Sequence, residues 1–354
     1  MINDVCSEFK SGKNIKADSI SESGEYPVYG GNGLRGYTSS YNHEGLYVLI
    51  GRQGALCGNV RSVNGKTYIT EHAIAAAGNE KSNTSFLHYL FLKMNLGQYS
   101  DQSAQPGLAV NKLLKLEVSL PPISEQKKIA KLLSLLDERI ATQNKIIEDL
   151  KKLKCAIIEK HYLQAKLHKY KICDLGVPFS VGSLSKEDLS EKGHECILYG
   201  ELFTTYDCVI NEVKSHTNKI ANTTLSQKGD LVFPSSTTVD AVSLISPSVI
   251  DIPNVILGGD MFGIHIDKKF NAYYLSYYIN LIARKKLAIY AKGSTIIHLH
   301  YNDIANAQLL LPDLCEQDII AKCMIAEDNK IKVEEQLLTK LENQKQYLLR
   351  QMFV

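Results

Sequence analysis

The sequence predicts a mixed α+β protein in which two similar globular domains are separated by two long helices that form an antiparallel coiled coil. A stretch of more than forty residues occurs twice without a gap. Both copies carry a heptad pattern of apolar residues, and the segments that precede them share the same order of predicted elements. We therefore expect two halves related by an approximate two-fold axis.

The repeated stretch spans Leu120–Tyr162 and, 191 positions later, Leu311–Phe353. Both copies open with Leu-Pro, continue with Glu-Gln and Ile-Ala-Lys, and carry an aspartate at the same place (Asp137 and Asp328). Neither copy contains Pro or Gly after its opening residues. Because these two residue types are the strongest helix breakers, each copy is expected to form one uninterrupted helix.

Apolar residues recur in each copy at alternating steps of three and four, which is the pattern of helices that supercoil around each other. The expected interface residues are Ile129, Leu133, Leu136, Ile140, Ile147, Leu150 and Ile157 in the first copy and Ile320, Met324, Ile331, Leu338, Leu341 and Leu348 in the second. Polar residues break the pattern at matched places, Gln143 and Lys154 against Glu334 and Lys345. Two unrelated amphipathic helices are the alternative, but the matched breaks favour a pair.

The connection between the first helix and the second globular domain is short, only Leu163–Tyr170. The second domain must therefore lie near the C-terminal end of the first helix. Because the second helix starts from that domain, it has to run back along the first helix, which predicts antiparallel pairing. The expected boundaries are 1–118 and 166–310 for the globular domains, and 119–165 and 311–354 for the helices.

Both globular segments follow one plan. In the first, strand candidates at Tyr26–Tyr29, Leu46–Ile50 and Lys66–Thr70 precede a short apolar helix at Phe86–Leu96. The second segment carries a corresponding helix at Tyr274–Arg284, whose tyrosines at helical spacing are expected to be mainly core residues. The loops between these elements differ in length and content, so we expect a shared scaffold with divergent loops.

Composition limits the class of protein. With 354 residues the chain is long enough for two domains or more, and 44% hydrophobic and 22% charged residues are ordinary for a globular protein. No apolar run approaches the roughly 20 residues that span a bilayer, and Met1–Lys10 lacks a signal-peptide core. The eight cysteines form no C-x-x-C pair, which indicates free thiols and a cytoplasmic protein without a membrane partner. A net charge of +2 neither requires nor excludes nucleic acid.

The opening of the long helix, Leu120-Pro121-Pro122 followed by Glu125-Gln126 and repeated after a second domain, resembles the specificity subunit of Type I restriction–modification enzymes. The resemblance covers essentially the whole chain. It implies two target-recognition domains that each read half of a split sequence in double-stranded DNA, with the helices as a spacer. It also implies a non-catalytic subunit without a cofactor, which carries two methyltransferase subunits and, in the restriction complex, two nuclease–translocase subunits.

Two features depart from the family pattern. The second copy of the repeat reads Leu311-Pro312-Asp313, and no counterpart of Tyr170-Lys171 precedes Ile2. We therefore expect a frayed first strand or a shortened N-terminus.

Polar residues in the Gly-rich loops are the candidates for DNA contacts. Arg and Gln suit guanine and adenine, Ser and Thr can take either role, and Lys suits phosphate. The candidates are Asn32, Arg35, Arg52, Gln53 and Gln105 in the first half and Ser235, Ser236, Thr237, Lys292, Ser294 and Thr295 in the second. Arg52-Gln53 and Ser235–Thr237 occupy equivalent loops with different side chains, as two different half-sites require. Structural or solvated turns are the alternative for every one of these loops.

Other motifs carry no chemistry. Gly31–Gly36 fits G-x-G-x-x-G, but no helix is expected after it, which disfavours a dinucleotide or S-adenosylmethionine site. His298-x-His300 lacks further ligands at metal-site spacing. No methyltransferase or nuclease motif is present, which disfavours an enzyme in its own right. The remaining alternative is a coiled-coil scaffold that binds only protein.

Overall fold

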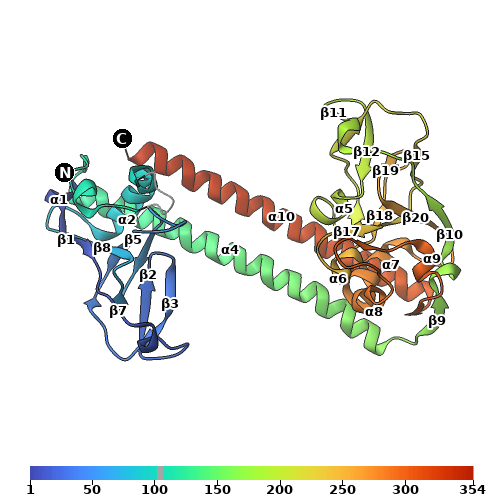
Figure 1. The fold of residues 1–354 in the computed structure, drawn as a ribbon, viewed down its shortest axis with the longest axis horizontal. Helices are drawn as coiled ribbons and strands as arrows, with labels where there is room; N and C mark the ends of the chain where they lie inside the picture. The colour runs from blue at the N-terminus through green and yellow to red at the C-terminus, as the bar shows by residue number, and fades with distance from the viewer. Residues whose placement is uncertain (102–106, 354) are drawn as a thin grey trace. The chain divides into compact units, whose positions relative to one another are not determined.

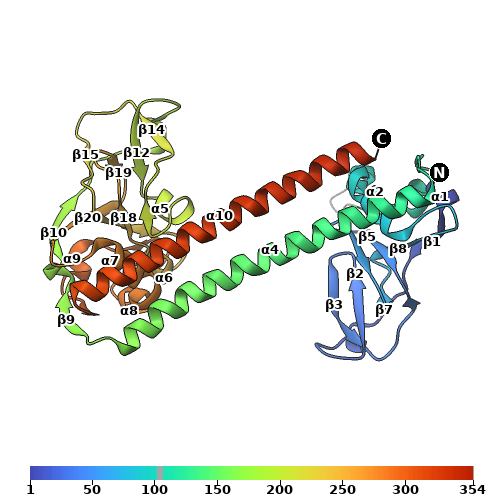
Figure 2. The same cartoon turned by 180° about the vertical axis from the view of Figure 1, so that it is seen from behind.

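The computed structural model describes residues 1–101 and 107–353 and confirms the mixed α+β class (Figure 1). The chain forms two compact units. Unit 1 comprises Met1–Lys145 and the segment from Glu335 onward, and unit 2 comprises Ile146–Glu334. The long helices α4 (Ile123–Gln164) and α10 (Leu314–Met352) pack antiparallel, so each unit contains one half of each helix (Figures 1 and 2).

Unit 1 contains two four-stranded sheets. The first has the order β1 (Cys6–Ser11), β8 (Ala73–Gly78), β5 (Tyr47–Gly51), β6 (Val60–Val63). The second has the order β3 (Gly33–Thr38), β2 (Tyr26–Gly30), β7 (Lys66–Ile69), β4 (His43–Glu44). The strand candidates and the short helix expected in this segment are therefore present as β2, β5, β7 and α2 (Thr84–Met94).

Unit 2 contains two five-stranded sheets and two strand pairs. One sheet has the order β10 (Gly176–Ser180), β20 (Met261–Ile266), β16 (Asp230–Pro234), β18 (Ser248–Ile250), β13 (Val209–Ile210). The other has the order β11 (Leu189–Ser190), β14 (Ser215–Thr217), β12 (His194–Leu198), β19 (Ile256–Gly258), β15 (Thr224–Leu225). The strand pairs are β17 (Ser236–Thr237) with β21 (Ile297–His298), and β22 (Gln308–Leu311) with β9 (His168–Lys171).

The two units have one topology. Unit 2 repeats both strand orders of unit 1, and it adds β13 at the edge of one sheet and β11 at the edge of the other. The directions agree as well, because β2 pairs parallel with β7 and β12 pairs parallel with β19, whereas the neighbouring pairs are antiparallel.

Short helices complete both units. The α-helices are α1 (Ile2–Val5), α3 (Val110–Leu113), α5 (Glu201–Thr204), α6 (Ala241–Leu244), α7 (Ala272–Tyr278), α8 (Arg284–Ala288) and α9 (Tyr301–Ile304). The 3₁₀ turns lie at Ala17–Ser19, Leu96–Tyr99, Ile172–Asp174 and Lys186–Asp188, and a π-helical turn at Ile279–Ala283 joins α7 to α8. Within the described residues, no helix is long and apolar enough to cross a membrane.

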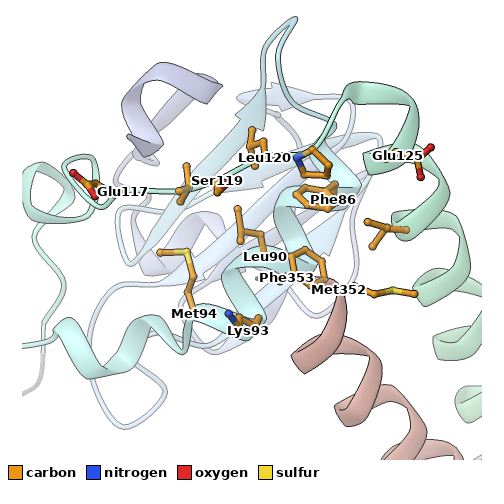
Figure 3. Close-up of a pocket in the computed structure, with 13 residues that line it drawn as sticks. Phe86, Leu90, Lys93, Met94, Glu117, Ser119, Leu120, Glu125, Met352 and Phe353 are labelled. Carbon is orange, nitrogen blue, oxygen red and sulfur yellow. The ribbon is translucent and has the colours of Figure 1, made fainter.

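Each core lies between a sheet, a domain helix and the two long helices. In unit 1, Phe86 of α2 packs on Phe353, which follows the end of α10, with ring centroids 4.8 Å apart (Figure 3). In unit 2, Tyr274, Tyr277 and Tyr278 of α7 are buried, which confirms their predicted core role. All eight cysteines are free thiols.

The glutamine of the repeated Glu-Gln motif has a structural explanation. Gln126 is 1% exposed, donates to the Pro121 carbonyl (2.8 Å) and the Lys81 carbonyl (2.9 Å), and accepts from the Asn83 amide (2.8 Å). Asn83 in turn caps α2 by accepting from the Phe86 amide at 3.0 Å. The start of α4 is thereby tied to the start of α2.

Gln317 forms the same link in unit 2. It is also 1% exposed, donates to the Pro312 carbonyl (2.8 Å) and accepts from the amide of Asn271 (2.9 Å). Asn271 caps α7 by accepting from the Tyr274 amide at 2.9 Å. We call Gln126 and Gln317 the glutamine links.

The predicted interface residues of the long helices are all withdrawn from solvent. Buried members are Leu133, Leu136, Ile147, Leu150, Ile320, Met324, Ile331 and Leu341, and half-buried members are Ile129, Ile140, Ile157, Leu338 and Leu348. The two lysines that interrupt the pattern form matched ion pairs with the opposite helix. Lys154 meets Asp328, and Lys345 meets Asp137, each at 2.5 Å.

Candidate nucleic-acid interface

Three loops of unit 1 meet at one end of its sheets. They are the β2–β3 hairpin turn at Gly31–Asn32, the segment Arg52–Gly54 after β5, and His72 in the β7–β8 turn. The Arg52 amide donates to the His72 carbonyl at 2.9 Å. A Cβ on Gly31 would lie 2.7 Å from that carbonyl oxygen, so the hairpin can approach this closely only with glycine at that position.

The Arg52 side chain links parts of this region by hydrogen bonds. Its side chain is half-buried, Nε donates to the Leu108 carbonyl at 3.3 Å, and Nη1 donates to the Ser11 hydroxyl at 3.1 Å. Gln53 is exposed, and its Oε1 lies 2.9 Å from Nδ1 of His72. Of the two predicted base readers in this loop, Gln53 is therefore the one presented to solvent.

Further polar and cationic side chains lie at and near the hairpin turn. Asn32 and Arg35 are exposed, as their proposed role requires. Arg61 of β6 was not predicted, yet its guanidinium reaches Gly33 so closely that a Cβ there would lie 2.3 Å from Nη1. The pairing of Leu49 with Arg61 places it beside the other loops, and nothing in the local sequence pattern indicates that pairing.

In unit 2, the pairing of β17 with β21 brings together the two predicted loops, Ser235–Thr237 and Lys292–Thr295. The Ser235 amide donates to the Asp260 carbonyl at 2.7 Å, and the Ser235 carbonyl accepts from the Leu299 amide at 2.8 Å. Ser235 is 3% exposed and Ser236 is 7% exposed, whereas Thr237 is half-buried. Of these three predicted contacts, Thr237 is therefore the one whose side chain is most accessible to solvent.

Ser294 and Thr295 are exposed on the second of these loops. Lys292 is exposed too, but its ammonium contacts the Asp303 carboxylate at 2.5 Å. The hydrogen bond from Lys292 lowers the pKa of Asp303, aided by the His300 amide. A phosphate that binds Lys292 would therefore compete with an existing ion pair.

The same pairing of loops occurs in unit 1. Gln53 forms a bridge with Gly107, and the Leu108 amide donates to the Arg52 carbonyl at 2.9 Å, as Leu299 does to Ser235. Gln105, predicted as a contact in this loop, lies outside the described residues. Both units thus build their candidate surface from the loop after the central strand and the loop that precedes the long helix.

Two further motifs of these surfaces can be compared with known ligand sites. The Gly31–Gly36 stretch continues into strand β3, so the helix that a dinucleotide-binding loop requires is not there. His298 and His300 stack at 6.2 Å, and the described part of the chain contains no group of three or more residues that could hold a metal ion.

Several curated proteins that are similar in sequence to this chain are described as Type I specificity subunits. The specificity subunit of the Type I restriction enzyme EcoprrI from Escherichia coli is 41% identical over 172 residues, which cover 46% of this chain and 42% of the relative. A putative Type I specificity subunit from Haemophilus influenzae is 32% identical over 127 residues, or 35% of this chain and 33% of the relative. This chain thus aligns with less than half the length of these two proteins. The MjaVIII specificity subunit of Methanocaldococcus jannaschii is 26% identical over 74% of this chain and 68% of its own.

Solved structures share the fold. A Type I restriction–modification S subunit from M. genitalium matches with a TM-score of 0.71 and 17% identity, over 100% of this chain and 95% of that one. A second match comes from a study of complex assembly and conformational transition of the Type I system, with a TM-score of 0.57 and 14% identity over 99% and 95% of the chains. At such identities the likeness concerns the fold alone. The family model described as "Type I restriction modification DNA specificity domain" matches residues 1–152 and 172–343, and the chain therefore belongs to the family of Type I restriction–modification specificity subunits.

Proposed function

We propose that this chain reads a bipartite site in double-stranded DNA, one half with each unit, and that it performs neither methyl transfer nor cleavage itself. One observation carries the proposal. Both units build a surface from the same two loops on the same strand order, and the side chains on those loops differ. A conserved scaffold with different polar groups is what the reading of two different half-sites needs.

The exposed groups suit contacts with DNA. In unit 1, Gln53 can form a bidentate contact with adenine, and the exposed Arg35 and half-buried Arg61 supply cations near the hairpin for guanine or phosphate. In unit 2, the accessible groups are Thr237 and the hydroxyls of Ser294 and Thr295. The unit 2 surface offers fewer free cations, because Lys292 is paired with Asp303. We expect unit 1 to contribute more of the salt-dependent affinity.

The proposed partners follow from the family. We propose that two methyltransferase subunits and, in the full complex, nuclease–translocase subunits assemble on this chain in the cytoplasm, and that the long helices dock the methyltransferases. A scaffold that binds only protein is the other candidate. It would use the same helices, but it gives no reason for two loop surfaces with different polar side chains.

The decisive experiment changes one solvent-accessible candidate contact in each unit. Gln53→Ala and Thr237→Ala are each assembled with methyltransferase subunits, and methylated sites are sequenced. Each variant should lose discrimination at one half-site by about 10- to 100-fold, the equivalent of roughly 1–3 kcal/mol, and leave the other half-site unchanged. Arg52→Ala is a poorer probe of base reading, because it also removes the hydrogen bonds from Arg52 to the Ser11 hydroxyl and the Leu108 carbonyl.

The same assay includes a matched control. Ser235→Ala changes a buried hydroxyl two residues before Thr237 and should leave both half-sites unchanged. Equal loss at both half-sites from Gln53→Ala, or no loss from either Gln53→Ala or Thr237→Ala, would contradict base reading and favour the scaffold. Methyl transfer or cleavage by the isolated chain with S-adenosylmethionine and DNA would contradict the non-catalytic assignment.

We further propose that helix length sets the gap between the half-sites. α4 and α10 are each one continuous helix that begins in one unit and ends in the other. Removal of one heptad from both helices at matched positions preserves the packing register and shortens each helix by about 10 Å. DNA can absorb part of this change, so the preferred gap should shrink by about two to three base pairs. An active complex with an unchanged gap would overturn the spacer role.

A further inference from the structure

Two residues of unit 1 form a chain of side-chain contacts with Gln53. The Ala73 amide donates to the Thr70 carbonyl at 3.1 Å, which closes a tight turn between β7 and β8. Glu71 and His72 are the two central residues of this turn. Nδ1 of His72 lies 2.9 Å from Oε1 of Gln53, and Nε2 lies 3.2 Å from Oε1 of Glu71. The imidazole ring therefore lies between a carboxylate and an amide.

The backbone places this turn beside Gln53. The Arg52 amide donates to the His72 carbonyl at 2.9 Å, and Gln53 forms a bridge with Gly107. The side chains of Glu71 and His72 are 34% and 46% exposed. Oε2 of Glu71 is buried and has no hydrogen-bond partner within residues 1–101 and 107–353. A positive charge on the His72 ring would therefore compensate a carboxylate that is partly withdrawn from water.

Unit 2 keeps the backbone contact of this turn and changes its side chains. The Ser235 amide donates to the Asp260 carbonyl at 2.7 Å, as the amide of the equivalent residue does to His72 in unit 1. Asp260 therefore takes the place of His72, and Gly259 that of Glu71. The shared scaffold forms without an acidic residue and a histidine in the turn. Glu71 and His72 thus belong to the part of the surface that differs between the units.

The atoms on both sides of the imidazole ring are oxygens, which accept protons from donors. Oε1 of Gln53 can accept only if Nδ1 of His72 carries a proton, and the Glu71 carboxylate favours a proton on Nε2. The observed arrangement is therefore that of the doubly protonated ring. A ring with one proton would keep it on Nε2, next to the carboxylate. Nδ1 would then be an acceptor, and the NH2 group of Gln53 would have to turn toward it.

We propose that Glu71 and His72 are positioning residues, which fix the orientation of the Gln53 amide and thereby make unit 1 read adenine. With the ring doubly protonated, Oε1 of Gln53 faces His72 and keeps a second lone pair for the amino group of adenine. The NH2 group is then free to donate to N7 of the same base. In the reversed amide, oxygen and nitrogen exchange places, so the two bonds to adenine cannot form together. The orientation matters only if Gln53 reads DNA as proposed above.

Other charged side chains near the turn have partners or lie on a neighbouring loop. The Arg52 guanidinium forms the hydrogen bonds described above, and Asp101 contacts Lys112 at 3.5 Å. Arg35 is exposed on the β2–β3 hairpin. Bound DNA would bring phosphates close to the turn, and their negative charge favours the doubly protonated ring of His72. The orientation that suits adenine is therefore also the one that DNA binding supports.

A pH series with a base that lacks N7 tests the orientation of the amide. The DNA carries either the adenine that Gln53→Ala ceases to discriminate or 7-deazaadenine in its place, which keeps base pairing and lacks the N7 acceptor. Fluorescence anisotropy gives the affinity of the complex with methyltransferase subunits for each DNA. The parent should bind the 7-deazaadenine site about tenfold more weakly at about pH 6, and nearly as well as the adenine site at about pH 8, where histidine has lost its second proton.

Substitutions in the turn supply matched controls. His72→Lys only donates, so it should keep the preference for adenine over 7-deazaadenine at both pH values. His72→Glu only accepts, so it should turn the NH2 group of Gln53 inward and abolish that preference at both. Glu71→Gln can donate to Nε2 of a neutral ring, so its preference should change less with pH than that of the parent. Each preference is a ratio between two DNAs bound by the same protein, so a general change in phosphate affinity cancels.

Several results would overturn the proposal. They are a parent preference that does not change with pH, equal preferences of His72→Lys and His72→Glu, and a discriminated base other than adenine. Base discrimination at the half-site of unit 2 should stay the same in every variant, and a change there would show that the substitutions act on the whole complex. In all of these cases Gln53→Ala can still lose discrimination, which leaves the proposed function standing. If Gln53→Ala loses none, base reading by Gln53 fails first, and the role of the turn fails with it.

Discussion

Unit 1 and unit 2 share their buried framework and differ in their exposed loops. Strand order, strand direction, the glutamine links and the matched ion pairs recur in both. The residues that differ are those at the strand ends, where Gln53 and Arg61 stand in one unit and Thr237 and Lys292 in the other. Close packing therefore constrains the residues of the buried framework that position the loops, whereas the exposed residues of the loops can differ between the units.

The ion pairs show how closely the framework is repeated. Asp328 accepts from Lys154 and from the Tyr277 hydroxyl, each at 2.5 Å. Asp137 likewise meets Lys345 at 2.5 Å and accepts from the Tyr89 hydroxyl at 2.9 Å. Burial and the neighbouring carboxylate raise the pKa of both tyrosines, so their hydroxyls remain donors. Each cluster joins α4, α10 and a domain helix.

The largest expected effect comes from breaking the glutamine links. Gln126→Ala leaves the Asn83 amide and the Lys81 and Pro121 carbonyls without this partner, and each buried group costs about 1–3 kcal/mol. Gln126→Ala should therefore lower the free energy of unfolding by about 4 kcal/mol, and Gln317→Ala by about 3 kcal/mol because fewer groups are involved.

Hydrogen exchange of α2 and α7 measures the effect of these substitutions on each unit. Gln126→Ala should speed exchange in α2 and Gln317→Ala in α7, and exposed Lys127→Ala should change neither. If both glutamine variants were as stable as Lys127→Ala, the explanation of the repeated glutamine would be wrong.

A smaller loss is expected from the aspartates. Asp328→Ala leaves Lys154, whose side chain is 17% exposed, without its counter-charge and should cost about 3 kcal/mol. Burial opposes the charged form of Lys154, and the hydrogen bond and charge of Asp328 outweigh that cost and raise its pKa. Asp137→Ala should cost slightly less, because the side chain of Lys345 is 22% exposed.

Denaturant titration of both aspartate variants tests this ranking. The double variant Asp328→Ala/Lys154→Met should recover most of the loss, because no uncompensated charge remains. A double variant as unstable as Asp328→Ala alone would show that the ion pair is not the cause.

Much of the framework could be predicted from sequence, because helix periodicity and a repeated motif are local signals. The heptad pattern predicted two helices, observed as α4 and α10, and the strand candidates correspond to β2, β5 and β7. Side-chain roles in the loops could not be predicted as well. The guanidinium of Arg52 meets Ser11, a residue 41 positions away that is brought near by the order β1-β8-β5. Ser235 and Ser236 are buried where the chain enters the pairing of β17 with β21, and that long-range pairing also has no local signal.

The smallest expected effect concerns a position where the two frameworks differ. His88 stands in α2 at the place of Ser276 in α7, counted from the capping residues Asn83 and Asn271. Ser276 donates to the Cys208 carbonyl at 2.7 Å and the Pro247 carbonyl at 3.0 Å. Nδ1 of His88 is buried and has no partner within the described residues.

Burial lowers the pKa of His88 from 6.5 to about 4, with Asp137 acting against the shift and Lys345 adding to it. The unfolded chain therefore binds a proton below pH 6.5 that the folded chain does not bind until about pH 4. Stability should fall as the pH drops through this window, by about 2 kcal/mol between pH 7 and pH 5. His88→Asn removes the titrating group, so its loss over the same range should be smaller by that amount in urea titrations. The other residues with lowered pKa values are carboxylates, which titrate at lower pH. If the free energy of unfolding of the parent and of His88→Asn changed equally between pH 7 and pH 5, burial in unit 1 would not keep His88 neutral.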